Sequence, residues 1–286
     1  MKFCNKLLSS CSFLSLNCPI FKIVLIVYML YSIFHIKKIE KKLNMLSANN
    51  KVILENITDI DKIKRASGDV LKVQILELNL LKNIDVFFVE NKLEYWLDWG
   101  TLLGSVRHSG FIPWDDDIDI GMMRKNYEIL RNKIKNGLKL KNIRFYISDI
   151  IHVVDENSDV EIDIFPYDFA NEEKLENEIT ERVRFVKYWS KLFLGKTSIA
   201  EYASKISKKY EVENSNYVIA GIEYPHEGTA SKIYNTSDIF PLIKIKFEGH
   251  NFPAPKNPDK YLSIRFGNYK NLPSDFGCNQ HSGISC

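Results

Sequence analysis

Two segments of the chain alternate between hydrophobic and acidic residues, which is the pattern of a strand with one buried face. Residues Asp117 to Met122 read DIDIGM, and residues Val160 to Phe169 read VEIDIFPYDF. Because successive side chains of a strand point to opposite faces, the isoleucines of each segment share one face and the acidic residues share the other. We therefore predict two strands that bury their aliphatic faces and present carboxylates on the opposite side.

The rest of the pattern predicts helices and strands in mixed order. Hydrophobic residues recur at helical spacing within residues 51–94, notably Val70, Val73, Leu76, Leu80 and Leu81. Further predicted elements are a strand at 95–99, a glycine-opened turn or short helix at 100–108, helices at 124–134, about 172–193 and 198–209, a strand-like run at 143–154 and a short helix near 259–266. This order of elements predicts an α+β domain.

The N-terminal region carries a hydrophobic segment. Residues 20–36 read IFKIVLIVYMLYSIFHI, and lysines follow directly after it. Its length is at the short limit for a membrane-spanning helix, which is about 17 residues. The strictly uncharged part, residues 23–34, is shorter and is also typical of a signal-peptide core or a buried helix. Since no small-residue cleavage site follows, we favour an uncleaved signal anchor, a single transmembrane helix.

The domain organisation follows from this anchor. We predict an N-terminal tail at 1–19, the transmembrane helix at 20–36, a stem at 37–69, one folded domain at 70–275 and a flexible tail at 276–286. The lysines after the helix outnumber those before it, which slightly favours a cytosolic domain. Two glycosylation sequons, beginning at Asn56 and Asn235, favour a lumenal domain instead.

Composition and charge are those of a globular protein. The 286 residues are 45% hydrophobic and 26% charged. The net charge of +3, with both signs intermixed, gives no indication of nucleic-acid binding. Only Cys278 and Cys286 follow the hydrophobic segment, so the folded domain holds at most one disulfide and must depend on its hydrophobic core. The spacing of these cysteines with His281 matches no standard zinc site.

The segment FIPWDDDIDIG, residues 111–121, crowds together the carboxylates of Asp115, Asp116, Asp117 and Asp119. On the predicted strand Asp117 and Asp119 share one face, and Asp163 lies on the acidic face of the second strand. If the strands pair, three carboxylates meet, and their repulsion is on the order of several kcal/mol unless a cation neutralises it. Oxygen ligands favour Mg²⁺ or Mn²⁺, which complete their coordination with water and phosphate oxygens.

Two other interpretations of the acidic segment are weaker. A solvated loop does not usually alternate aspartate with isoleucine. The spacing of Asp115, Asp117 and Asp119 also fits the first ligands of an EF-hand. That loop needs glycine at its sixth position and glutamate at its twelfth, where this chain has Ile120 and Asn126. A site for Mg²⁺ or Mn²⁺ is therefore the favoured hypothesis.

Small residues just upstream are candidate phosphate ligands. Gly104 and Ser105 belong to the segment GTLLGS, where backbone N–H groups can approach an anion closely. Arg107 follows, and its guanidinium can bind a phosphate with two hydrogen bonds. Taken alone, the segment is also explained by a tight turn with Leu102 and Leu103 in the core, followed by a surface arginine.

These motifs together resemble the LicD and fukutin-related phosphotransferase family. The resemblance rests on WGTLLGSVRHSGFIPWDDDIDIGM, then EIDIFPYD, and later DIFPLIKIKFEGHNFPAPKNPDKYLSIRFGNYKNLP, and it covers residues 95–273. It implies a core sheet similar to the nucleotidyltransferase fold of DNA polymerase β, with flanking helices. Gly104 and Ser105 would then bind the donor, with Asp117 and Asp119 on one strand and Asp163 on its neighbour. Residues that fit the later motif without an assigned role are Asp238, Phe247, Glu248 and Tyr261.

The resemblance also implies an activity. Residues 70–275 would be a catalytic domain that moves a phosphocholine or ribitol-phosphate group from a CDP-linked donor onto a glycan or glycoprotein. Asp117 and Asp119 would bind Mg²⁺ or Mn²⁺, and Asp163 would either complete the metal site or act as the base. Eukaryotic members are anchored in the Golgi by an N-terminal helix, which implies a lumenal, type II arrangement. A non-catalytic scaffold and a true nucleotidyltransferase are the alternatives.

Overall fold

The computed structural model describes residues 65–189, 196–223 and 231–270, which fold into helices and a mixed sheet. The predicted α+β class is confirmed. The predicted anchor at 20–36, most of the stem, the C-terminal tail and the sequon at Asn56 lie outside the described residues. No helix within the three described ranges is long and apolar enough to cross a membrane.

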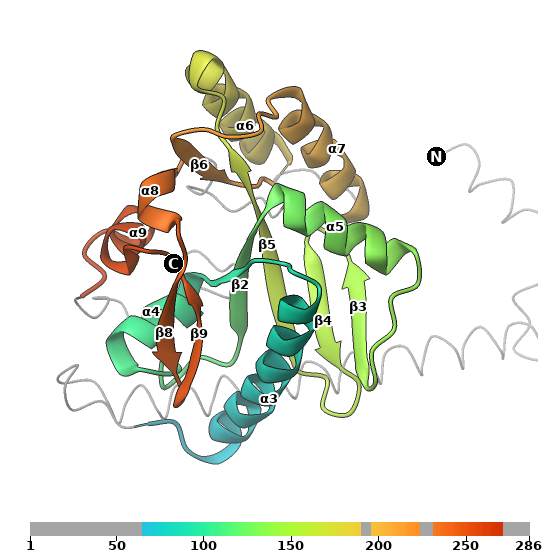
Figure 1. Cartoon of the computed structure of the whole chain (residues 1–286), viewed down its shortest axis with the longest axis vertical. Helices are drawn as coiled ribbons and strands as arrows, with labels where there is room; N and C mark the ends of the chain where they lie inside the picture. Colours follow the sequence, from blue (N-terminus) through green and yellow to red (C-terminus); the bar gives the residue numbers. More distant parts are fainter. Residues whose placement is uncertain (1–64, 190–195, 224–230, 271–286) are drawn as a thin grey trace, which may run out of the picture. The chain divides into compact units, whose positions relative to one another are not determined.

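A seven-stranded mixed sheet forms the centre of the fold (Figure 1). Its strands are β1 (Trp96–Leu97), β2 (Ile118–Met123), β3 (Ile143–Ile147), β4 (Ile151–Asp155), β5 (Glu161–Phe169), β6 (Tyr217–Ala220) and β7 (Ile233–Asn235). The order is β1-β2-β5-β4-β3, while β6 pairs with the last residues of β5 and with β7. Of the strand pairs in this sheet, β2 with β5 is parallel and the others are antiparallel. The two predicted acidic strands are therefore direct neighbours.

Helices and one hairpin surround this sheet. They are α3 (Gly68–Glu90), α4 (Trp99–His108), α5 (Arg124–Lys135), the 3₁₀ turn η3 (Glu172–Lys174), α6 (Leu175–Trp189), α7 (Lys196–Lys209), α8 (Thr236–Ile239), α9 (Pro258–Phe266) and the β8–β9 hairpin (Ile243–Phe247 with His250–Ala254). Figure 1 shows α3 and α5 on the near side of β2 and β5, and both helices contact β5. The hairpin and α9 lie beside α4. Helix α3 is thus close to the central strand pair.

Three predicted elements differ from the structure in their extent. The predicted strand at 95–99 ends early because the carboxylate of Asp98 accepts a hydrogen bond from the Trp99 N–H at 2.8 Å, which caps α4. The segment predicted as a turn or short helix is therefore a full helix, which ends at Ser109 in the left-handed conformation, φ 55°. The run at 143–154 is two strands rather than one. The chain reverses where the Ser148 N–H donates to the Ile150 carbonyl at 3.0 Å.

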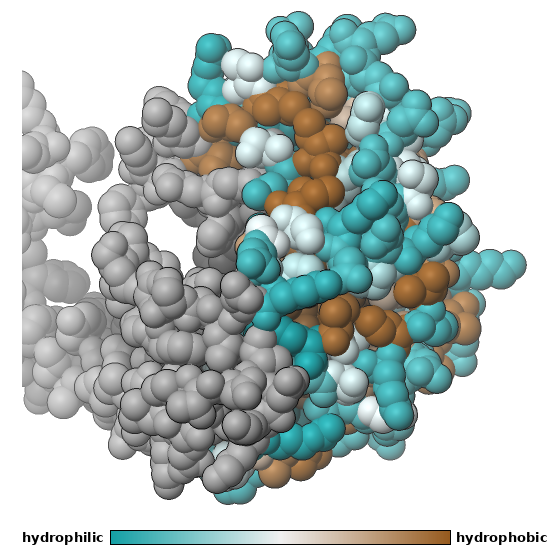
Figure 2. Space-filling view, turned by 90° about the vertical axis from the view of Figure 1, so that its left-hand side faces the viewer, coloured by the Kyte–Doolittle hydropathy of each residue, from teal (hydrophilic) through white to brown (hydrophobic). Residues whose placement is uncertain are grey.

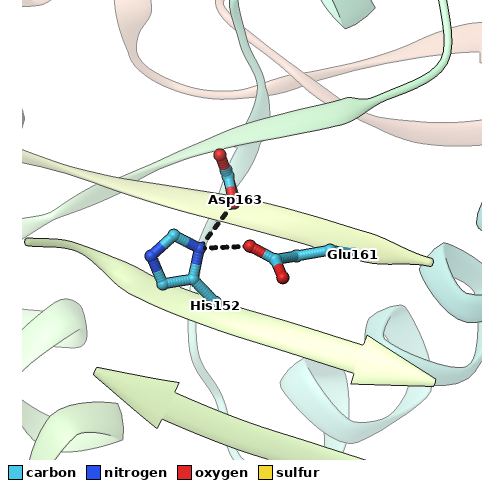
Figure 3. Close-up of side chains that lie close together, drawn as sticks. All are labelled: His152, Glu161 and Asp163. Carbon is cyan, nitrogen blue, oxygen red and sulfur yellow. Dashed lines mark hydrogen bonds and ion pairs between the residues drawn. The ribbon is translucent and has the colours of Figure 1, made fainter. Parts of the chain in front are cut away.

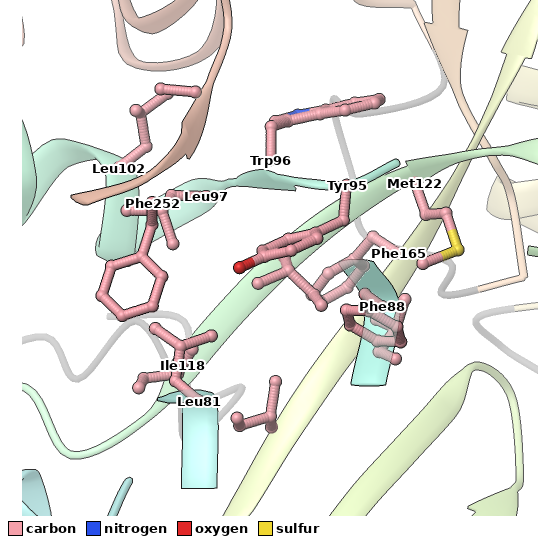
Figure 4. Packing of buried hydrophobic residues seen from close by; sticks show 14 of the residues in the cluster. Leu81, Phe88, Tyr95, Trp96, Leu97, Leu102, Ile118, Met122, Phe165 and Phe252 are labelled. Atoms are coloured by element: carbon pink, nitrogen blue, oxygen red, sulfur yellow. The ribbon is translucent and has the colours of Figure 1, made fainter. Parts of the chain in front are cut away.

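The hydrophobic core lies where the alternating pattern places it. The isoleucines of β2 and β5 are fully buried: Ile118, Ile120, Ile162 and Ile164. Figure 4 shows Ile118 near Leu81 of α3, with aromatic rings around them. Burying each isoleucine stabilises the fold by about 1.5–3 kcal/mol, which fixes the register of both strands. A Cβ added at Gly121 would lie 2.5 Å from the Trp96 ring, so this close packing of strand and ring requires glycine.

Polar residues cover much of the described surface. On the face drawn in Figure 2, hydrophobic residues in brown form separate groups among hydrophilic residues in teal. The exposed large hydrophobic residues include Leu71, Ile75, Val86 and Val89, all on α3. Helix α3 therefore has one face in the core and hydrophobic residues on its outer face as well.

Candidate active site

Strand register brings three polar side chains into one row across the sheet. Asp119 of β2 is the direct partner of Asp163 of β5 in the parallel pair. On the other side of β5, His152 of β4 is the direct partner of Asp163 in the antiparallel pair. Neighbouring strands lie about 4.8 Å apart, and residues directly opposite each other point to the same face. The row Asp119, Asp163, His152 is therefore a consequence of backbone pairing.

His152 holds two carboxylates of β5, those of Glu161 and Asp163 (Figure 3). Its Nδ1 lies 2.7 Å from Asp163 Oδ1 and 2.7 Å from Glu161 Oε1. Its Nε2 lies 2.8 Å from the hydroxyl oxygen of Ser148. The ring of Tyr146 stacks on the imidazole at 4.5 Å, and the Tyr146 hydroxyl donates to Glu161 at 2.9 Å. The imidazole is thus fixed by contacts to both nitrogens and to one ring face.

These contacts change the pKa values of the cluster. Burial by itself lowers the pKa of His152, but hydrogen bonds with Asp149, Asp163 and Glu161 outweigh burial and raise this pKa to about 11. The imidazole is therefore protonated at neutral pH and donates to the carboxylates. Burial raises the pKa of Asp163, and the hydrogen bond from His152 partly opposes this effect. The cluster is a charged, hydrogen-bonded unit that orients Asp163.

The same three residues could hold a metal ion. Within the described part of the chain, His152, Glu161 and Asp163 form the one group of at least three potential ligands whose ligand atoms all lie within 4.8 Å of one another. An imidazole must lose its proton to coordinate a metal, so binding there would release the proton that His152 holds. The cluster therefore has two chemical options, to bind a metal or to orient Asp163.

The predicted metal ligands Asp117 and Asp119 lie beside this cluster. Asp119 is 6% exposed, and Asp117 is partly exposed just before β2. Their oxygens do not join those of Asp163 in a group within 4.8 Å among the described residues. Carboxylates repel one another, and Asp163 instead accepts a hydrogen bond from His152. The structure thus brings Asp119 and Asp163 together by register, while their joint coordination of an ion stays a prediction.

Helix α4 fixes the acidic segment from the other side. The backbone N–H of Asp119 donates to the Thr101 hydroxyl at 2.8 Å, and the Asp98 N–H donates to the Asp119 carbonyl at 3.0 Å. The side chain of Asp115 packs so closely on Gly100 that an added Cβ there would lie 2.7 Å from Asp115 Oδ2. The first turn of α4 therefore adjoins the carboxylates, and its backbone N–H groups are the ones that the helix leaves without intrahelical partners.

Gly104 and Ser105 lie deeper, in the second turn of α4. A Cβ at Gly104 would be 2.4 Å from the Gly110 carbonyl, so this position packs against the following loop. The Ser105 hydroxyl donates to the Lys246 carbonyl at 3.0 Å and is buried. Backbone N–H groups in a second turn donate within the helix. The contacts seen here are packing contacts, and a role in donor binding stays a prediction for both residues.

Arg107 lines a cavity of about 330 Å³. Its guanidinium donates to the Tyr269 carbonyl at 3.3 Å and to His108 Nε2 at 3.2 Å. Burial lowers its pKa, and the nearby negative charge of Asp115 opposes this effect. The arginine therefore lies within electrostatic range of the acidic segment. Its predicted contact with a phosphate is not tested by these contacts.

Sequence reasoning missed two functional candidates. His152 has a signal in the sequence, because pairing the strands across the polar turn DENSD places it opposite Asp163. Glu77 is the second candidate, and it is 2% exposed on the inner face of α3. The sequence could have indicated Glu77, because it is a charged residue at a position where the helical period predicts burial.

The part of the chain that builds this site is similar to a known protein family. Residues 92–194 match the family model described as LicD/FKTN/FKRP, nucleotidyltransferase domain. Residues 92–194 are therefore similar to the nucleotidyltransferase domain of the LicD/FKTN/FKRP family. The match includes β2, β4 and β5, and so all the residues of the row across the sheet. The resemblance expected from the sequence motifs is confirmed, and with it an enzyme of the LicD and fukutin-related type.

Several individual proteins are similar to the chain. The lipopolysaccharide cholinephosphotransferase LicD of Haemophilus influenzae is 28% identical over 248 residues, which cover 71% of this chain and 91% of the relative. The human ribitol 5-phosphate transferase FKRP is 23% identical over 180 residues, covering 61% of this chain but 28% of the relative. An uncharacterised protein of Rickettsia prowazekii is 49% identical over 47 residues, covering 16% of this chain and 18% of the relative.

Proposed function

We propose that this protein is a divalent-metal-dependent transferase that moves a substituted phosphate, of the phosphocholine or ribitol-phosphate type, from a CDP-linked donor onto a glycan. The observation that carries the proposal is the pairing of Asp119 with Asp163 on neighbouring parallel strands, inside the segment that matches the family. The names of the LicD and FKRP relatives support transfer of a substituted phosphate.

The residues present fit a hard divalent cation. Carboxylate oxygens make up the predicted donor set, and Oε2 of Glu77 on α3 is a further carboxylate oxygen that is buried without a hydrogen-bond partner among the described residues. Asp117, Asp119 and Asp163 are the residues that would hold Mg²⁺ or Mn²⁺. When bound, the ion would offset the negative charge of the donor diphosphate and hold it in position.

Asp163 is the residue best placed for proton transfer. Its pKa is raised by burial, and His152 fixes one of its oxygens at 2.7 Å. A carboxylate held in this way can accept the proton of an acceptor hydroxyl as the hydroxyl attacks the phosphorus atom. Glu161 shares the same histidine but also receives the Tyr146 hydroxyl, so its oxygens are already engaged. We therefore assign Asp163 as base or ligand, and Glu161 as a supporting group.

Donor phosphates are expected at the start of α4. The first-turn N–H groups and the positive end of the helix dipole favour anions there. Arg107 belongs to the last turn of the same helix, and the charge of Asp115 acts on its guanidinium. It is therefore proposed as a further phosphate contact. Gly104 and Ser105, the predicted donor-binding residues, support this helix by packing in its second turn.

Transfer of a nucleotidyl group is a second candidate function, favoured by the nucleotidyltransferase description of the matching family model. The same carboxylates would serve both reactions, because both break a phosphoanhydride bond of a nucleotide bound to a divalent ion. The products differ. Transfer of the substituted phosphate from a CDP-linked donor releases CMP, whereas nucleotidyl transfer from a nucleoside triphosphate releases diphosphate.

Product analysis tests the proposal. Full-length protein in detergent is incubated with Mn²⁺, a glycan acceptor mixture and a panel of CDP-linked donors, and in parallel with CTP. CMP released from one donor, and lost when EDTA is added, is the expected result. Diphosphate from CTP without CMP from any donor would favour nucleotidyl transfer and contradict the proposal.

The proposal includes an anchored protein with a lumenal catalytic domain, held in a Golgi or other secretory-pathway membrane by residues 20–36. Its support is the hydrophobic segment itself and the sequon at Asn235, whose side chain is exposed where β7 meets α8. A glycan at Asn235 would place this domain in the lumen.

A further inference from the structure

Helix α3 carries a buried carboxylate that the fold does not satisfy. Glu77 is 2% exposed, and its Oε2 has no hydrogen-bond partner among the described residues. No basic side chain in the described part of the chain forms an ion pair with it. Glutamate is rarely buried unless it is paired, because desolvation of the charge is unfavourable. The other buried positions of this face are mostly apolar, so packing alone gives no reason for an acid here.

Gln74 places Glu77 against the acidic segment. Its side-chain amide donates to the Asp115 carbonyl at 2.7 Å and to the Ile112 carbonyl at 3.2 Å, which holds α3 to this loop. Residues three apart in a helix lie on one face, so Glu77 is directed to the same side one turn later. The acidic segment, which Gln74 holds at the Asp115 carbonyl, lies on that side of the helix.

The electrostatics of Glu77 agree with this placement. Burial raises its pKa well above the usual range, and the charges of Asp117, Asp116, Asp115 and Asp119 raise it further, in that order. A fifth acid at this point increases the repulsion that the acidic segment already contains. A divalent cation would reverse that repulsion and supply the missing partner of Oε2.

We propose that Glu77 is a further carboxylate of the divalent-cation site, contributed by α3 to the acidic segment of β2. This inference rests on the cation in the proposed function, and it adds a residue that lies outside the family match at 92–194. It also has a consequence for the fold. Binding of the ion links α3 to β2, so the cation stabilises the packing of that helix.

Mn²⁺ binding tests the inference without any donor or acceptor. Full-length protein in detergent is titrated with Mn²⁺, and free Mn²⁺ is measured by its electron paramagnetic resonance signal. Glu77→Gln keeps the shape of the side chain and removes the charge, so we expect the affinity to fall by about tenfold or more. Glu90→Gln, on an exposed position of the same helix, is the matched control and should bind like the wild type.

Thermal unfolding provides a second readout, because the expected change in unfolding temperature has opposite effects without and with Mn²⁺. Without Mn²⁺, Glu77→Gln should unfold at a higher temperature than the wild type, because a repelling charge is gone. With Mn²⁺, the wild type should gain more in unfolding temperature than the variant, because a ligand that binds the native state more tightly stabilises it more. If Glu77→Gln does not fold, as judged by circular dichroism, Glu77→Met takes its place and should show the same loss of Mn²⁺ affinity.

The outcomes separate this inference from the proposed function. Wild-type affinity in Glu77→Gln, with a loss in Asp119→Asn, would overturn the role of Glu77 and leave the metal site of Asp119 in place. Absence of Mn²⁺ binding by the wild type would overturn both the inference and the metal dependence. A loss in Glu77→Gln but not in Glu90→Gln supports the inference.

Discussion

Replacement of His152 tests whether this residue orients Asp163. The imidazole Nδ1 lies 2.7 Å from Asp163 Oδ1, and the raised pKa of His152 makes this a hydrogen bond between charged groups. Such a bond contributes about 1.5–3 kcal/mol. If that energy holds Asp163 in place for reaction, His152→Ala should lower kcat/KM between about 10-fold and 150-fold, since each 1.4 kcal/mol corresponds to about tenfold in rate.

The assay is CMP release by full-length protein from the donor that the panel identifies, with kcat and KM measured separately. His152→Gln retains a side-chain donor and should lose less kcat than His152→Ala, which a merely structural role would not predict. His250→Ala, at an exposed histidine of β9, is the control and should retain wild-type rates. A folded His152→Ala variant with near-wild-type kcat would refute the argument that His152 positions Asp163.

Three further predictions concern stability and topology. Ile164→Ala removes a fully buried side chain from the centre of the sheet, so the free energy of unfolding in urea should fall by about 2–5 kcal/mol, and a fall below 1 kcal/mol would contradict this packing. Burial opposes the ionisation of Asp168, but Arg124 and Arg182 hold its pKa well below the ordinary value. The advantage of the wild type over Asp168→Asn should therefore be complete above pH about 4 and shrink as the pH falls below it, whereas a pH-independent difference in urea unfolding would contradict the ion pairs. If the domain is lumenal, endoglycosidase should increase the gel mobility of protein from secretory cells, and Asn235→Gln should reduce that shift; an equal shift in the variant would exclude a glycan at this site.

Local pattern was sufficient to predict the central strands. The alternation of isoleucine with acid at 117–122 and 160–169 predicts both strands and their buried faces, because only one register buries every isoleucine. The capping of α4 by Asp98 was less apparent, since aspartate also occurs in strands that end at a turn. This cap changes where Gly104 and Ser105 lie in the helix. Starting the helix at Trp99 moves Gly104 and Ser105 into its second turn, away from the N–H groups that can bind an anion.

The contacts between distant segments were not readable from local pattern. Parallel pairing of β2 with β5 depends on the intervening helix and hairpin, and the family resemblance implied only that the two aspartate-bearing strands are neighbours. The approach of α3 to the acidic segment depends on one side chain, Gln74, whose partners are backbone carbonyls more than thirty residues away. Helical periodicity places Glu77 on the buried face but does not identify what it meets there.

CMP release by Asp119→Asn, Asp163→Asn and Glu161→Gln tests the central claim most directly. Each change keeps the shape of the side chain and removes one negative charge. Asp119 and Asp163 belong to the row across the sheet, and Glu161 lies beside that row on β5. The account predicts a fall in kcat of roughly two orders of magnitude or more for Asp119→Asn and Asp163→Asn, and a much smaller fall for Glu161→Gln. Near-wild-type kcat in either aspartate variant, with the fold intact by circular dichroism, would contradict the assignment of this site as the centre of phosphate transfer.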